Sequence, residues 1–97
     1  MQISKTSENG KLTLFVDGRL DTNTAQYLEA ELQLDGITEV VLDFANLEYI
    51  SSAGLRVLLT AKKAMMSCGG SISVLNANEP VRDVFDITGC SEMFNMG

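Results

Sequence analysis

The stretch Tyr49–Lys63, YISSAGLRVLLTAKK, places two adjacent serines between an apolar segment and an amphipathic one. Upstream, EVVLDF (39–44) is a short and almost unbroken apolar run, typical of a strand at the covered centre of a sheet. Downstream, the apolar residues of 55–66 recur at helical spacing, and the glycines that follow suit a helix C-terminus. The stretch therefore predicts a strand-to-helix turn, with Ser51 or Ser52 as a helix N-cap.

The segments before this turn predict a hairpin and a first helix. KLTLFV (11–16) alternates apolar and polar residues, and Gly10 just before it predicts a hairpin with an edge strand around Ile3. TNTAQYLEAELQL (22–34) has helical spacing and predicts an amphipathic helix. We expect Asp21 or Thr22 to cap this helix.

The segments after the turn predict a strand and a final helix. SISVL (71–75) alternates like a strand, and NEPVRDVFDITG (78–89) carries a cap at Asn78 or Glu79, a first-turn proline and a terminal glycine. The tail CSEMFNMG (90–97) could add a short strand. The order β-β-α-β-α-β-α predicts an α/β fold with a mainly parallel sheet, and we expect residues 1–97 to form a single domain.

Charge, hydropathy and cysteine content disfavour several classes of function. The 97 residues carry a net charge of -6, which disfavours nucleic acid and anionic lipid and favours a protein partner. No apolar run approaches the roughly 20 residues that span a bilayer, and the start lacks the features of a secretion signal. Cys68 and Cys90 are too few for a disulfide framework, so we expect two buried free thiols in a cytoplasmic protein.

Catalysis by the serines is disfavoured. The chain has no histidine, which removes the commonest general base and the usual metal ligand, so we expect neither an enzyme nor a bound cofactor. A nucleophile elbow needs G-x-S-x-G, whereas ISSAG begins with Ile50. A Ser-Lys dyad with Lys62 or Lys63 is a further alternative, but these lysines lie two or more helical turns away.

A phosphoacceptor aspartate is another alternative, with Asp43 at a strand end as the candidate. Such a site needs an acidic pair for Mg²⁺, for which Asp17 and Asp21 are available, but a fold that begins with a hairpin does not suit it. We therefore interpret Asp43 as a residue that caps a turn. The remaining hypothesis is that another enzyme phosphorylates Ser51 or Ser52. A helix N-terminus tolerates a phosphate, and the added charge would repel a bound partner.

Three separated segments, GRLDTNTA, VVLDFANLEYISSAGLRVLL and PVRDVFDITG, resemble the STAS domain, and in particular the stand-alone anti-sigma factor antagonists of bacteria. The resemblance covers about Leu12 to Phe94. It implies a four- or five-stranded mixed sheet with helices mainly on one face. It also implies regulation of transcription through signalling between proteins, without enzymatic activity in this chain.

The resemblance also implies particular site residues. The family's phosphorylated serine lies two residues before a Gly-Leu pair, which is Gly54-Leu55 here, so the acceptor is Ser52. The expected partner is a cognate anti-sigma factor that is itself a serine kinase using Mg-ATP, and it binds the unphosphorylated form. A PP2C-type phosphatase is a further expected partner, and we expect a monomer. The expected docking surface is Asp21 together with the loop 48–53 and the next helix, with contacts from Glu48, Tyr49, Ser51, Ala53, Gly54 and Arg56.

One departure from the family pattern leaves alternatives open. The best-known antagonists have an acidic residue immediately before the phosphoserine and a serine after it, where this chain has Ser51 and Ala53. Ser51 is therefore a rival acceptor. Other STAS domains are subunits of transport machinery, so the alternative function is a scaffold subunit of a transport or signalling complex, without a phosphorylation switch.

Overall fold

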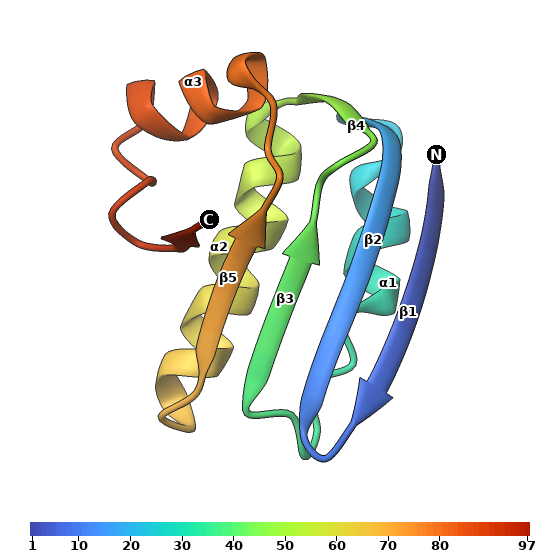
Figure 1. Cartoon of the computed structure of the whole chain (residues 1–97), viewed down its shortest axis with the longest axis vertical. Coiled ribbons are helices and arrows are strands. Elements are labelled where there is room, and N and C mark those ends of the chain that lie inside the picture. The colour runs from blue at the N-terminus through green and yellow to red at the C-terminus, as the bar shows by residue number, and fades with distance from the viewer.

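The computed structural model describes all of residues 1–97, in which six strands form one mixed sheet (Figure 1). Five of them are hydrogen-bonded in the order β1-β2-β3-β5-β6, and β4 pairs with the end of β2. β1 is antiparallel to β2, and all other pairings are parallel. The strands are β1 (Gln2–Glu8), β2 (Lys11–Leu20), β3 (Glu39–Asp43), β4 (Leu47–Ile50), β5 (Ser71–Leu75) and β6 (Asn95–Met96).

The expected hairpin joins β1 to β2 through a two-residue turn. Glu8 pairs with Lys11, and the residues between them, Asn9 and Gly10, have φ angles of 51° and 83°. Positive φ at both central residues is the requirement of a type I′ turn, whose twist matches that of the flanking strands. This local chemistry sets the register of the edge strand, in which Ile3 lies opposite Val16.

Three helices complete the fold: α1 (Ala25–Glu31), α2 (Ser52–Ser67) and α3 (Glu79–Ile87). In Figure 1, α1 and α2 lie behind the sheet, while α3 lies at the upper end, where it contacts β4. The mixed sheet, with α1 and α2 on one face, confirms the fold class expected from the sequence. β6 confirms the short strand expected in the tail, and β4 brings the strand count above the expected four or five.

α1 is shorter than the predicted helix 22–34, and its expected caps are wrong. Its N-cap residue is Thr24, which makes no side-chain cap, because Asp21 instead holds the preceding residues in a separate turn. The helix ends at Leu32, whose φ and ψ of -88° and 66° leave the helical region. Asn78, by contrast, caps α3 as expected and accepts a hydrogen bond from the Val81 N–H at 2.9 Å.

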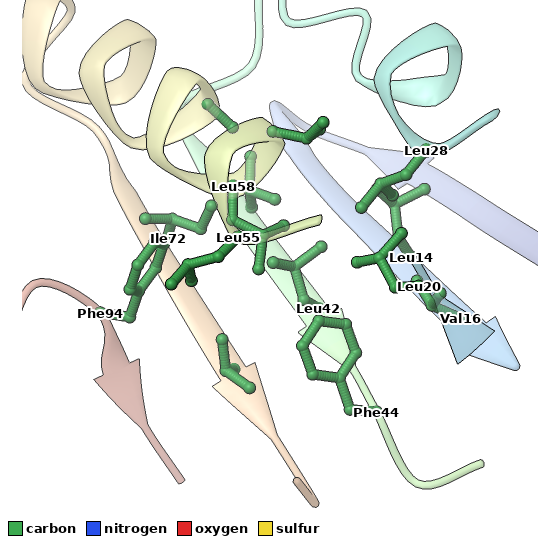
Figure 2. Packing of buried hydrophobic residues seen from close by; sticks show 14 of the residues in the cluster. Leu14, Val16, Leu20, Leu28, Leu42, Phe44, Leu55, Leu58, Ile72 and Phe94 are labelled. Atoms are coloured by element: carbon green, nitrogen blue, oxygen red, sulfur yellow. The ribbon is translucent and has the colours of Figure 1, made fainter. Parts of the chain in front are cut away.

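The core lies between the sheet and the two helices behind it. Figure 2 shows Leu55 and Leu58 of α2 facing apolar side chains from β2, β3 and β5. Leu14, Leu42 and Ile72 of these strands are fully buried. Burying one such side chain contributes about 1.5 to 3 kcal/mol, so this interface fixes where α2 lies on the sheet.

The opposite face of the sheet is not covered by a helix. Phe15 remains 41% exposed there, whereas Val41 on the central strand is buried by its neighbours. The alternation predicted for β2 is therefore confirmed. Cys90 is buried as expected, but Cys68 is exposed, because it caps the C-terminus of α2 beyond the edge of the core.

The C-terminal segment returns to the sheet after α3. The rings of Phe85 and Phe94 pack edge to face with centroids 5.5 Å apart, and the Gly97 N–H donates to the Val74 carbonyl at 2.7 Å. These contacts anchor α3 close to the strand ends that carry the candidate site.

None of the three helices is both long and apolar enough to cross a bilayer.

Candidate functional site

The predicted site lies at the end of the sheet where β2, β3 and β5 terminate and α2 begins (Figure 1). The segment 48–53, which we expected to be a loop, is partly a strand. Leu47–Ile50 forms β4 and pairs with the last residues of β2, and a register shift between Gly18 and Arg19 leaves Glu48 without a partner. The backbone before the serines is therefore fixed by sheet pairing.

The two serines have different roles in the structure. Ser51 has an extended backbone, is the N-cap of α2, and its Oγ accepts a hydrogen bond from the Gly54 N–H at 3.4 Å. The Ser51 N–H donates to the Leu20 carbonyl at 2.8 Å, which ties this end of α2 to β2. Ser52 is the first helical residue, and its side chain is exposed. Capping thus occupies Ser51 and leaves Ser52 facing solvent.

Gly54 sets how closely α2 approaches β2. A Cβ atom at this position would lie 2.6 Å from Leu20 Cγ and 3.0 Å from the Leu20 carbonyl oxygen. Only glycine allows this approach without a shift, because Leu20 is fully buried. Gly54 is itself buried, so its contribution to a docking surface is to position its exposed neighbours.

Asp21 organises the turn between β2 and α1. Its Oδ1 accepts hydrogen bonds from the N–H groups of Asn23 at 2.9 Å and Thr24 at 3.1 Å, while its Oδ2 lies 3.9 Å from Nε of Arg19. Partial desolvation raises the pKa of Asp21, but these hydrogen bonds and the Arg19 charge outweigh it and hold the pKa below its ordinary value. Asp21 is therefore ionised near neutral pH.

Arg19 is a site residue that sequence reasoning did not single out. Its guanidinium lies 4.6 Å from the ring centroid of Tyr49, with which it is paired across β2 and β4. The same side chain is the ion-pair partner of Asp21, so Arg19 links the turn after β2 to β4. The signal available in the sequence was strand alternation, which puts Arg19 and Asp21 on the same side of the chain.

The remaining predicted docking residues lie on the same end of the molecule. Glu48 and Tyr49 are exposed on β4, Ala53 is half-buried, and Arg56 is exposed one turn into α2. Arg56 has no carboxylate partner, because the chain's two ion pairs are Lys5–Glu31 and Arg19–Asp21. The end of the sheet therefore presents hydroxyl, acidic, aromatic and basic groups together.

The structure does not place side chains as a phosphoacceptor aspartate, a metal site or a Ser-Lys dyad would require. The Asp43 carboxylate accepts hydrogen bonds from the Ala45 N–H at 3.0 Å and the Asn76 side-chain amide at 3.2 Å, which is the turn-capping role that we favoured. No group of three acidic, cysteine or histidine side chains is placed to hold a metal ion. Lys62 lies ten residues beyond Ser52, which is about 15 Å along a helix axis.

The class of protein follows from comparison with known families. The STAS domain family model matches residues 2–97, and the chain belongs to this family. BtrV of Bordetella bronchiseptica, whose name describes it as a candidate anti-sigma factor antagonist, is 38% identical over 97 residues, covering 97% of this chain and 84% of BtrV.

Solved structures of the antagonist SpoIIAA have the same fold. The unphosphorylated form of SpoIIAA matches with a TM-score of 0.87 and 18% identity, covering 99% of this chain and 88% of SpoIIAA. The phosphorylated form of the Bacillus protein matches with a TM-score of 0.79 and 17% identity, covering 99% of this chain and 91% of SpoIIAA. At this level of identity the likeness concerns the fold.

Proposed function

We propose that this chain is an anti-sigma factor antagonist whose binding to a serine-kinase anti-sigma factor is controlled by phosphorylation of Ser52. The observation that carries the proposal is the division of roles between the two serines. Ser51 is used as the N-cap of α2, whereas Ser52 is exposed in the first turn. A kinase would reach the Ser52 hydroxyl without breaking the cap that holds the helix in place.

The relatives support the same function. BtrV, at 38% identity, bears the name of a candidate anti-sigma factor antagonist, and SpoIIAA, an antagonist of the same fold, occurs in unphosphorylated and phosphorylated forms. The docking surface that we propose consists of Asp21, Glu48, Tyr49, Ser51, Ala53, Gly54 and Arg56. We include Arg19 in it because its side chain contacts both Tyr49 and Asp21.

The proposed switch acts through charge and desolvation at this surface. A phosphoserine adds a charge of about -1.5 to -2 near neutral pH, together with a bulky hydrated group. The helix itself tolerates the phosphate, because the positive end of the α2 dipole lies beside it and no acidic residue occupies the first turn. A partner that covers Ser52 would have to desolvate the phosphate, so phosphorylation would release it.

The proposal assigns the chemistry to the partners. The kinase supplies Mg-ATP and the phosphoryl transfer, a PP2C-type phosphatase reverses the modification, and this chain is a non-enzymatic, monomeric, cytoplasmic binding module.

Mapping the phosphate tests the site assignment. The purified chain is incubated with Mg-ATP and the serine kinase encoded nearest to it in the genome. Cleavage after Glu48 and Arg56 then isolates the peptide Tyr49–Arg56, in which Ser51 and Ser52 are the only serines. Fragment masses that place one phosphate on Ser52 support the proposal. A phosphate found on Ser51, or only outside this peptide, overturns the assignment.

Two matched variants separate the serines. Ser51→Ala should still accept the phosphate, whereas Ser52→Ala should not, and Ser52→Ala should bind the kinase constitutively. Ser52→Asp should lose binding while keeping its fold, because an exposed position tolerates the charge. Retained kinase binding by Ser52→Asp together with retained modification of Ser52→Ala would contradict the switch.

A further inference from the structure

Arg56 is the free cation closest in sequence to Ser52. The two residues are four positions apart on α2, and both side chains are exposed. Residues at this spacing lie on the same helix face with Cβ atoms about 5 to 6 Å apart. Helical side chains also lean toward the N-terminus, which directs the Arg56 guanidinium back toward the Ser52 turn.

The other arginine of this surface is already engaged. Arg19 stacks on Tyr49 at 4.6 Å and lies 3.9 Å from Asp21, whereas Arg56 makes no ion pair. No acidic residue in the first turn of α2 competes for Arg56. The unmodified chain therefore displays an uncompensated guanidinium one turn from the proposed phosphorylation site.

We infer that Arg56 forms an intramolecular ion pair with the phosphate of phosphorylated Ser52, an inference that rests on the proposed function. An anion four residues before a cation is the favourable orientation on a helix, and guanidinium and phosphate form charge-assisted, bidentate hydrogen bonds. Arg56 thus holds the phosphate group of phosphorylated Ser52 in position.

This pairing gives phosphorylation a second effect on the docking surface. In the unmodified chain Arg56 is available to an acidic group of the partner. Once Ser52 is phosphorylated, the guanidinium turns to the phosphate and is withdrawn from that contact. The switch then both adds an anion and removes a cation from the same face of α2.

The test measures the second pKa of the phosphate by ³¹P NMR. Phosphoserine is incorporated at position 52 during protein synthesis, so that no kinase is needed. A nearby cation favours the dianion, so Arg56→Gln should raise this pKa by about 0.3 unit at about 0.1 M ionic strength, where the Debye length of about 10 Å screens more distant charges. Arg56→Lys should recover part of the difference, and 1 M salt should remove most of it. The control Lys62→Gln, with the same charge change farther along α2, should shift the pKa by less than about 0.1 unit.

Other charged groups on the neighbouring elements are the same in every variant that is compared. They are Arg19 and Asp21 at the end of β2, Glu48 on β4, and Glu79 and Arg82 on α3, the helix that packs against β4. An unchanged phosphate pKa in Arg56→Gln, or an equal shift in Lys62→Gln, overturns the ion pair. That failure leaves the proposed function intact, because the proposed function is tested separately by kinase modification and binding.

Discussion

Gly54 provides the sharpest test of how α2 is held against β2. In Gly54→Ala the added Cβ would lie 2.6 Å from Leu20 Cγ and 3.0 Å from the Leu20 carbonyl oxygen. Leu20 is fully buried, so it has little room to move, and overpacking of this kind costs about 1 to 3 kcal/mol. The gain in helix propensity from glycine to alanine is at most about 1 kcal/mol. Because the shortest contact is to the branching carbon of a buried side chain, we expect an overpacking cost in the upper part of that range, about 2 to 3 kcal/mol, and hence a net loss of about 1 to 2 kcal/mol.

Urea unfolding followed by circular dichroism measures this loss, with a fall in Tm of about 5 to 10 °C as a second readout. Ala64→Gly, at an exposed position of the same helix, is the matched control and should destabilise by propensity alone. Alanine should thus be unfavourable at position 54 and favourable at 64. In a Leu20→Ala background, which removes Cγ, the cost of Gly54→Ala should fall by about 1 kcal/mol. A stabilising Gly54→Ala would refute the close approach of α2 to β2.

Three further predictions concern the cap, the turn and the core. Ser51→Ala should lower the free energy of unfolding by about 0.5 to 1 kcal/mol, whereas Ser52→Ala should change it by less than about 0.5 kcal/mol; equal losses would contradict the assignment of the cap. Asp21 has a lowered pKa in the folded state, so its charge stabilises the fold above the unfolded-state pKa, and this contribution disappears as the pH falls through the folded-state pKa. Asp21→Asn should therefore have a lower free energy of unfolding than the unsubstituted chain at pH 7. Urea titrations should show the difference between the two free energies shrinking below about pH 4. A difference that is constant with pH would count against the lowered pKa. Phe85→Ala should cost about 3 to 5 kcal/mol in urea unfolding, because a fully buried ring and its edge-to-face contact with Phe94 are lost; a loss below about 1 kcal/mol would mean that α3 is not anchored in this way.

Local patterns were sufficient to predict most of the fold. The alternation of Leu12, Leu14 and Val16, and the hairpin at Gly10 before them, depend on neighbouring residues and appear in the structure as expected. The cap at Asn78 is equally local. These features are encoded within a few residues of chain, which is why sequence reasoning finds them.

Features that depend on contacts between distant segments were missed. Leu47–Ile50 shows no alternating pattern, and it forms a strand only because the end of β2 offers a partner with a register shift at Gly18 and Arg19. The contact between Arg19 and Tyr49 has the same origin. α1 begins late because Asp21 holds a separate turn before it, and a capping residue and a turn-forming aspartate look alike in sequence.

The serine pair shows the same limit within the site. Spacing alone left Ser51 and Ser52 equally able to cap α2. The structure assigns the cap to Ser51 through its extended backbone and its bond to the Gly54 N–H. The identity of the phosphorylated residue stays a proposal that this division of roles supports.

The most direct test of the proposed switch is the affinity of the proposed partner, a serine-kinase anti-sigma factor, for two forms of the chain, measured by isothermal titration calorimetry. One form is unmodified, and the other carries phosphoserine at position 52, with phosphoserine at the exposed residue Ser67 as the control. We predict that phosphorylation at position 52 weakens binding by at least about tenfold, or roughly 1.4 kcal/mol, and that phosphorylation at position 67 leaves it unchanged. Equal affinities for the unmodified chain and the form phosphorylated at position 52 would contradict it.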